Sequence, residues 1–177
     1  IYIPKTEYGI IVDSLFVIKD KVKKNEFLSN ILLKYGVDYS TIDFIARHTK
    51  DTFDVRKIRF GNNYTVICDN DNSLKAKYFV YEINPYRYVL YDFTDSLQLQ
   101  KGEKEIIIQT DTINGVISSS LWNSLVEVGG DPNLANQLSE VYAWTVDFFG
   151  LQKGDEYQTI YEKIYVDGQY IELGKIV

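Results

Sequence analysis

Scarce residue types limit the chemistry that this chain of 177 residues can carry: it has one cysteine, one histidine and no methionine. Cys68 has no second cysteine to pair with, so the cysteine content does not indicate the redox compartment. A single histidine, His48, excludes an HExxH motif and any zinc site built from several histidines, and one cysteine excludes zinc sites built from thiolates. A Cys68–His48 dyad has no local signature, and Cys68 ends an apolar run, which predicts an inert buried thiol.

Long apolar runs and strongly basic runs are also missing. No stretch approaches the roughly 18 apolar residues that a membrane span needs, so we expect no membrane-spanning segment. The formal net charge is −6, and the one basic run, residues 19–24, is interrupted by Asp20. We therefore expect no nucleic-acid binding, whose affinity comes mainly from neutralised phosphates. The chain starts at Ile1 without an initiator methionine, which we interpret as a processed or trimmed piece of a longer protein.

Aromatic residues are abundant, with 15 Tyr and 9 Phe, and these side chains favour half-buried sheet surfaces. Helical periodicity also occurs, so the pattern predicts an α+β fold. Strands are predicted at residues 8–19, 64–68, 76–83, 87–93, 97–99, 105–110, 113–117, 157–166 and 170–176. Strands 97–99 and 105–110 are predicted to pair around a turn at residues 101–103. Strands 157–166 and 170–176 are predicted to form a hairpin with its turn at Asp167-Gly168. Helices are predicted at residues 25–35 with Asn25 as N-cap, 40–48 with Ser40 as N-cap, 119–128, and 133–142.

A repeat relates the two helical regions. Residues 28–67 align without a gap with residues 121–160, at a constant offset of 93 and with ten identities in forty. Each copy reads helix, turn, helix, turn, strand, which predicts two related βααβ units with a β-rich segment between them. The predicted divisions are residues 1–70, 71–117 and 118–177. Within the repeat, Asp54 and Asp147 are expected to cap a turn, and Gly61 and Gly154 to adopt a positive φ before the strand.

Exposed aromatic side chains can stack on the C–H face of a sugar ring. The candidates are Tyr86, Tyr88, Tyr91, Trp122, Trp144 and residues 148–149. In a chain with this much predicted sheet, however, packing in the core and across strands is their expected role. We therefore interpret residues 144–160 as a structural turn into a strand.

Residues 21–67 carry a V-K-x-x-x-x-L-x-x-I opening, the turn Tyr35-Gly36-Val37, and a glycine just before the closing strand. This segment resembles a degenerate LysM-like module. Residues 143–177 contain D-F-F, a Q-x-G-D turn, and Y-V-D-G followed by G-K-I. They resemble the region that precedes the catalytic domain in lysostaphin-type (LytM-like) zinc peptidoglycan endopeptidases of Gram-negative envelopes, which have LysM-like or opacity-associated-protein-A-like domains there.

The resemblance, which covers nearly the whole chain, implies a non-catalytic targeting or regulatory region of a cell-wall hydrolase in the periplasm or cell envelope. Its implied partners are peptidoglycan or the protein's own catalytic domain, which in some relatives is restrained by the preceding domains. Family members hold zinc through a His, an Asp and a His-x-His pair in that later domain. No catalytic residue or metal ligand carries over to this chain, so zinc is expected only in the domain that the chain lacks.

LysM modules generally bind N-acetylglucosamine chains between two loops, which here correspond to residues 24–27 and 53–58. The resemblance thus implies a glycan-binding groove formed by Asn25, Glu26, Phe27, Val55, Arg56, Lys57 and Ile58. Asn25-Glu26 stand where the family usually has Gly-Asp. A protein-interaction or scaffold module that touches no glycan is the alternative, distinguished by whether the Tyr and Trp side chains line an exposed groove or lie in the core. A self-contained enzyme is least expected, because the chain has one histidine.

Overall fold

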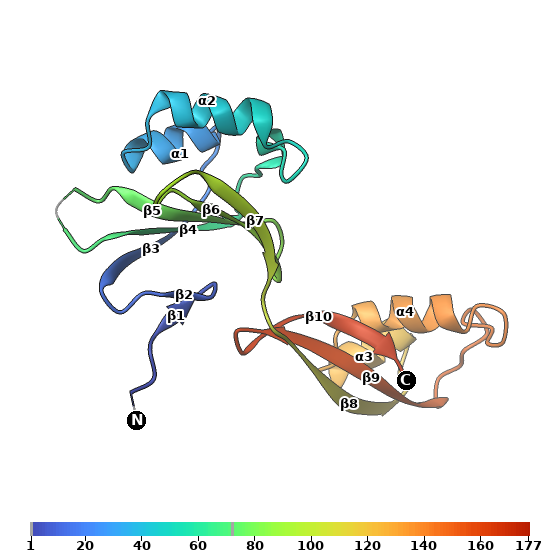
Figure 1. Cartoon of the computed structure of the whole chain (residues 1–177). Helices are drawn as coiled ribbons and strands as arrows, with labels where there is room; N and C mark the ends of the chain where they lie inside the picture. Colours follow the sequence, from blue (N-terminus) through green and yellow to red (C-terminus); the bar gives the residue numbers. More distant parts are fainter. Residues whose placement is uncertain (1, 72) are drawn as a thin grey trace. The chain divides into compact units, whose positions relative to one another are not determined.

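The computed structural model describes residues 2–71 and 73–177 and divides into two units, Ile1–Lys104 (unit 1) and Glu105–Val177 (unit 2) (Figure 1). Each unit combines antiparallel strands with two α-helices, which confirms the predicted α+β class. Unit 1 contains β1 (Thr6–Glu7), β2 (Ile10–Ile11), β3 (Leu15–Lys21), α1 (Leu28–Lys34), α2 (Tyr39–His48), the short 3-10 helix η1 (Val55–Lys57), β4 (Asn63–Asp69), β5 (Ala76–Glu82), β6 (Arg87–Asp92) and β7 (Gln98–Glu103). Unit 2 contains β8 (Ile106–Val116), α3 (Leu121–Glu127), α4 (Asn133–Val141), β9 (Glu156–Val166) and β10 (Gln169–Ile176).

Unit 1 is built on a five-stranded antiparallel sheet in the order β3-β4-β5-β6-β7. Helices α1 and α2 cover one face of this sheet (Figure 1). Alternation along β4 directs Tyr64, Val66 and Cys68 into the core that the helices complete, where Ile31 and Ile45 are fully buried. The sheet therefore contributes its aromatic and β-branched face to the same core as the amphipathic helices.

The N-terminal hairpin of β1 and β2 is tied to unit 1 through Tyr8. The Tyr8 ring meets the Tyr88 ring edge to face, with 4.9 Å between the centroids. The Tyr8 hydroxyl donates to Glu82 Oε1 at 2.7 Å and lies 3.1 Å from Thr65 Oγ1. Tyr88, Glu82 and Thr65 belong to three different strands, so one aromatic side chain links the hairpin to the middle of the sheet.

Unit 2 has a three-stranded antiparallel sheet in the order β10-β9-β8, with α3 and α4 packed against it. Its own core contains Leu125 and Leu134, both fully buried, together with Tyr161 of the central strand β9. The β9–β10 hairpin turns at Asp167 and Gly168, both with positive φ, which confirms the predicted turn.

Backbone hydrogen bonds of unit 1 recur in unit 2 at the offset of 93 residues. The recurring pairs include Val37 N–H to Leu32 O and Gly130 N–H to Leu125 O, Thr49 N–H to Ile45 O and Tyr142 N–H to Leu138 O, Phe53 N–H to Thr49 O and Val146 N–H to Tyr142 O, and Lys57 N–H to Asp54 O and Gly150 N–H to Asp147 O. Gly61 and Gly154 both have positive φ, as predicted. In each unit the order of elements is a strand, two helices and an antiparallel partner of the first strand.

The predicted divisions at residues 70 and 117 differ from those of the structure, which separates its units after Lys104. The reason is strand pairing: β5 pairs with β4 and extends the sheet of unit 1, whereas β8 pairs with β9 of unit 2. No separate β-rich segment therefore stands between two helical units. The segment 71–117 is shared between the two sheets.

The prediction of a turn at residues 101–103 is wrong, because this stretch lies inside β7. Gly102 is paired with Tyr88 of β6, and a Cβ on Gly102 would lie 2.2 Å from Tyr88 Cζ. The aromatic ring thus covers the glycine and occupies the space of its missing side chain. The same arrangement recurs in unit 2, where a Cβ on Gly115 would lie 2.6 Å from the hydroxyl of its partner Tyr157.

Two predicted helix caps are also wrong. Helix α1 begins after Phe27, and Asn25 has a φ of +62° outside the helix, where its side chain caps nothing. Asp38 caps α2 in place of Ser40, because its carboxylate accepts the N–H of Thr41 at 2.8 Å.

Candidate functional site

The predicted glycan-binding groove of unit 1 uses two segments, residues 24–27 and 53–58, and residues that flank them are hydrogen-bonded to each other. The N–H of Val22, just after β3, donates to Asn62 O at 2.9 Å, and the N–H of Gly61 donates to Val22 O at the same distance. This pairing holds the chain that leads into α1 beside the chain that leads into β4.

The first predicted segment presents Asn25 and Phe27 to solvent. Phe27 is 68% exposed, and its N–H donates to Asn30 Oδ1 at 2.9 Å. The carboxylate of Glu26, which is half-buried, accepts the N–H of Lys23 at 2.8 Å and closes the turn before the helix. Glu26 is thus engaged in local structure, whereas Phe27 offers an exposed ring.

The second predicted segment forms the short helix η1. Val55 and Ile58 pack against the core of unit 1, while Arg56 and Lys57 are exposed. The carboxylate of Asp54 accepts the backbone N–H of Arg56 at 3.0 Å and also its guanidinium, with 2.6 Å between Oδ2 and Nη2. The Arg56 hydrogen bonds lower the pKa of Asp54 to about 2. This carboxylate is therefore satisfied within the protein, and its predicted role as a turn cap is confirmed.

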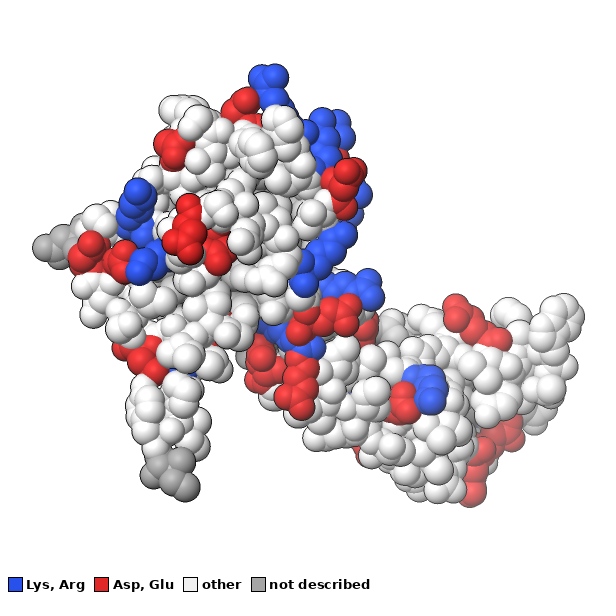
Figure 2. All heavy atoms as spheres, viewed as in Figure 1, with Lys and Arg blue, Asp and Glu red and all other residues white. Residues whose placement is uncertain are grey.

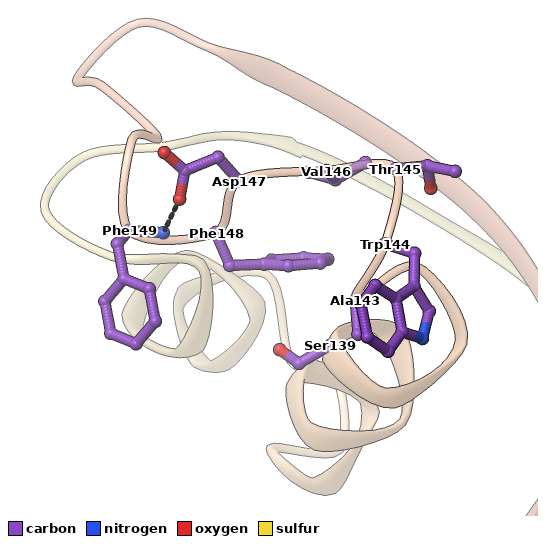
Figure 3. Close-up of a pocket in the computed structure, with 8 residues that line it drawn as sticks. All are labelled: Ser139, Ala143, Trp144, Thr145, Val146, Asp147, Phe148 and Phe149. Carbon is purple, nitrogen blue, oxygen red and sulfur yellow. Dashed lines mark hydrogen bonds between the residues drawn. The ribbon is translucent and has the colours of Figure 1, made fainter.

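Unit 2 contains a hollow whose walls come from the end of α4 and the loop after it, which we name the aromatic pocket (Figure 3). Its volume is about 610 Å³. The lining residues are Ser139, Ala143, Trp144, Thr145, Val146, Asp147, Phe148 and Phe149.

Local hydrogen bonds shape the aromatic pocket. The N–H groups of Thr145 and Val146 both donate to Tyr142 O at 2.9 Å, which reverses the chain just after α4. Asp147 Oδ1 then accepts the N–H of Phe149 at 3.1 Å, and Asp147 O accepts the N–H of Gly150 at 3.0 Å. Asp147 therefore caps a turn, as predicted, and this turn sets the directions of the residues that follow it.

The aromatic side chains of the pocket differ in exposure. Trp144 is 98% exposed and Phe149 is fully exposed, whereas Phe148 is half-buried and packs against the core of unit 2. In Figure 3 the Phe148 ring reaches across the hollow toward Ala143 and Trp144, and the Phe149 ring points the other way. The expectation that these aromatic residues pack in the core is therefore wrong for Trp144 and Phe149. It holds for Tyr91, which is fully buried.

A second, apolar hollow adjoins the aromatic pocket. It has a volume of about 310 Å³ and shares Val146 and Phe148 with the first. Its other lining residues are Ile117, Leu121, Leu138, Tyr142, Leu151, Glu156, Tyr157, Gln158 and Thr159. Val146 and Phe148 thus lie between the two hollows.

Basic residues are absent from the segment that lines the aromatic pocket, residues 139–149. No Lys or Arg occurs between Lys104 and Lys153, and eleven acidic against three basic residues give unit 2 a formal charge of −8. In Figure 2 the end of unit 2 that carries α4 and the following loop is mostly uncharged on the face in view.

The residues with catalytic potential do not meet. The His48 ring is exposed and stacks on Phe44, with 4.6 Å between the centroids. Cys68 is fully buried, and burial raises the pKa of its thiol, as expected for an inert cysteine. Across residues 2–71 and 73–177, no three His, Cys, Asp or Glu side chains come together in a way that could hold a metal ion. The described helices also include none with the length and apolarity required to cross a membrane.

Comparison with solved structures finds a similar fold in two bacterial proteins, one of which is described as a zinc containing peptidase. The chain superimposes on Helicobacter pylori Csd3 with a TM-score of 0.62 and 19% identity, over 90% of this chain and 43% of that one. A zinc containing peptidase from Vibrio cholerae gives a TM-score of 0.61 and 19% identity, over 88% of this chain and 49% of that one. The likeness at this identity is one of fold.

Comparison by sequence finds relatives whose names are those of peptidases. The chain is 28% identical over 111 residues to the peptidoglycan DD-endopeptidase ShyC of Vibrio cholerae, covering 62% of this chain and 25% of that protein. It is 20% identical over 168 residues to the DD-carboxypeptidase/endopeptidase Mpg of Neisseria meningitidis, covering 94% of this chain and 39% of that protein. An uncharacterized metalloprotease of Haemophilus influenzae is 22% identical over 157 residues, covering 88% of this chain and 32% of that protein. No family model matches the chain. The chain thus spans between a quarter and two-fifths of the length of these relatives.

Proposed function

We propose that this chain is a non-catalytic region of a zinc endopeptidase that cleaves peptidoglycan in the cell envelope, and that it positions or restrains the catalytic domain. The observation that carries this function is the match of about nine-tenths of the chain to a minor part of longer peptidases. Among the described residues, no three His, Cys, Asp or Glu side chains are placed to hold zinc: the single histidine stacks on Phe44, and the single cysteine is buried. Peptidoglycan and the catalytic domain are the partners.

The two units are two LysM-like copies of one βααβ element. The recurrence of backbone hydrogen bonds at the same offset as the ten sequence identities supports this origin. In unit 1 the glycan groove lies between the segments that contain Asn25 to Phe27 and Val55 to Ile58. The side chains exposed there are those of Asn25, Phe27, Arg56 and Lys57.

Targeting and restraint are tested separately. Residues 1–177 should sediment with purified sacculi at moderate salt, and the same chain heated until unfolded serves as the control. If the native chain stays in the supernatant, it does not target the enzyme to the wall. Restraint requires that deletion of residues 1–177 from the intact peptidase raises its rate of muropeptide release, and an unchanged rate would exclude it.

A protein-interaction module without glycan binding is the second candidate function. It is favoured by the exposed apolar side chains on the helices of unit 2, since Trp122, Val126 and Val141 are each more than two-fifths exposed. In that case the chain should bind its purified catalytic domain and ignore sacculi. If the chain sediments with purified sacculi when no other protein is present, this second candidate function is excluded.

A further inference from the structure

We propose that the free edge of β8 pairs, through residues 106–110, with the same edge of a second copy of this chain, so that two three-stranded sheets become one six-stranded sheet. The partner is neither peptidoglycan nor the catalytic domain, which takes the inference beyond the proposed function. Three features of the edge lead to it: unpaired backbone groups, exposed apolar side chains, and a run of residues that can pair with itself.

Strand β8 lies at the edge of the sheet of unit 2 and pairs with β9 on one side (Figure 1). Just past the end of β8, the N–H of Ile117 donates to Asp155 O at 2.8 Å, so odd-numbered residues point toward β9. Ile160 O instead accepts the N–H of Val177 at 2.9 Å, on the side of β10, which leaves its β8 partner Thr112 pointing outward. Even-numbered residues of β8 therefore direct their N–H and C=O groups to the free edge.

One part of this edge is covered by an aspartate of the same strand. The N–H of Thr112 donates to Asp111 Oδ1 at 2.8 Å, and Asp111 Oδ2 accepts from Lys163 Nζ. Residues 106–110, which we name the open run, precede this aspartate and contain no charged side chain. Within the described part of the chain, the outward N–H and C=O groups of the open run have no strand beside them, so they are available to another strand.

The side chains of the open run are apolar where the edge begins. Ile106, Ile107 and Ile108 are 40%, 48% and 56% exposed. Successive residues of a strand point to opposite faces, so apolar surface flanks the edge on both faces. The other edge strands of the five-stranded and three-stranded sheets, β3, β7 and β10, each carry two or more charged residues, whereas β8 has one in eleven. Charged side chains protect an edge from pairing with another chain, and the open run lacks them.

A second copy fits the open run because the run is compatible with itself. Antiparallel pairing about a two-fold axis at Ile108 places Ile108 opposite Ile108, and Ile106 opposite Thr110. These pairs join only even-numbered residues, whose N–H and C=O groups already point outward, as a hydrogen-bonded pair requires. On the other face Ile107 lies opposite Gln109. Such a contact uses the same surface on both copies and closes at a dimer.

Charge separates a second copy from another occupant. Unit 2 has a formal charge of −8, so two copies repel each other, while a basic strand of another protein would be attracted. In the two-fold pairing Glu105 lies opposite Asp111 of the second copy, and Lys163 offsets the charge of that aspartate. Salt screens the remaining repulsion without weakening the apolar contacts. Pairing between copies should therefore strengthen as salt rises, whereas a basic strand would be released.

The first test is sedimentation velocity of the 177-residue chain from about 10 μM to about 1 mM, because interfaces below about 1,200 Å² are typical of weak association. A monomer–dimer equilibrium should appear and shift toward the dimer at high salt. Ile108→Lys should weaken dimerisation by about tenfold or more. Ile160→Lys is the matched control, since Ile160 is 42% exposed on the same face but lies on the central strand, and it should leave dimerisation unchanged.

Thr110→Pro tests the backbone of the edge. The N–H of Thr110 points away from β9, so proline removes no hydrogen bond within unit 2 but blocks pairing with a second copy. Dimerisation should be lost while circular dichroism stays native. Amide exchange of the unmodified chain gives a second measurement: exchange should slow at Ile108 as concentration rises, and stay constant at Ile107 and Gln109, which are bonded to β9.

Three results would overturn the inference. The chain may not stay monomeric up to about 1 mM at high salt, since that excludes the pairing. Equal losses for Ile108→Lys and Ile160→Lys would show that the sheet face and not the edge forms the contact. If the intact peptidase is a monomer in which the Ile108 amide is protected, a strand of the same molecule occupies the edge. None of these results depends on sedimentation with sacculi or on the peptidase rate, so the proposed function is tested separately.

Discussion

The hydroxyl of Tyr8 donates a 2.7 Å hydrogen bond to Glu82 Oε1, although the two residues are 74 positions apart. Glu82 is 7% exposed, and its carboxylate also accepts from Lys104 Nζ at 2.7 Å and Asn63 Nδ2 at 3.0 Å. A buried carboxylate is stable only when its oxygens are satisfied in this way. The N-terminal hairpin is therefore a structural part of unit 1.

Tyr8→Phe should lower the free energy of unfolding of unit 1 by about 1.5–3 kcal/mol, the usual contribution of a hydrogen bond to a charged group. The ring contact with Tyr88 is retained in this variant, so the loss reports the hydroxyl alone. Urea unfolding followed by circular dichroism measures it. Tyr39→Phe, at a tyrosine that is 72% exposed, should change nothing. Equal midpoints for both variants would show that the Tyr8 hydroxyl contributes no stability.

Acid should weaken unit 1 through Glu82. Burial raises the pKa of this carboxyl, but hydrogen bonds from Lys104, Tyr8 and Asn63 outweigh burial and hold the pKa below its ordinary value of 4.5. A lowered folded pKa gives stability that is fully present above pH 4.5 and lost as the pH falls through the folded value. Unfolding free energies measured from pH 7 to pH 2.5 should fall in this window. Glu82→Gln should be less stable at pH 7 and show a shallower acid slope, and an unchanged slope would contradict the assignment.

Gly168→Ala should destabilise the β9–β10 hairpin by about 1–2 kcal/mol, because an L-residue with a side chain pays this cost in the left-handed region. The φ of Gly168 is +75°, and no atom lies within 4 Å of a Cβ added there, so the effect comes from the backbone and not from a clash. Gly168→Asn is the matched control, since Asn tolerates this conformation, and it should cost less. Thermal unfolding measures both, and an Asn variant less stable than the Ala variant would refute this explanation.

Leu125→Ala should cost about 2–5 kcal/mol in unit 2, the range for removing a buried leucine. Leu125 is fully buried in a core formed only by residues of unit 2, and Leu32 is its counterpart in the separate core of unit 1. Hydrogen exchange should therefore rise in α4 and β9 for Leu125→Ala, and in α2 and β4 for Leu32→Ala. If either variant raises exchange equally in both units, the two cores are one cooperative structure.

Local patterns predicted much of the fold, because they report interactions within a few residues. The hairpin at Gly168, the turn caps at Asp54 and Asp147, and the helix from Asn133 to Val141 all depend on neighbours in the sequence. The offset of 93 residues also led directly to matching hydrogen bonds in the two units. The turn preferences of glycine and aspartate and the periodicity of a helix depend on residues close in the sequence. Turns and helices of this kind can therefore be predicted from a single sequence.

Long-range pairing could not be predicted in the same way. Gly102 looked like a turn residue, but Tyr88 lies across it on the neighbouring strand and keeps it in β7. The helix that was expected to start at Asn25 starts after Phe27, because Asn25 has a φ of +62°, which lies outside the α-helical region.

The sequence by itself determined the α+β class, most of the helices and strands, and the lack of any histidine or cysteine cluster that could bind zinc. Only the tertiary structure decided that β5 to β7 extend the sheet of unit 1, and that Trp144 and Phe149 lie in solvent while Tyr91 is buried. The physical reason is that an aromatic side chain has the same local preferences whether it packs or protrudes. Its burial depends on which distant surface meets it, and the rings of Trp144 and Phe149 meet none within the described part of unit 2.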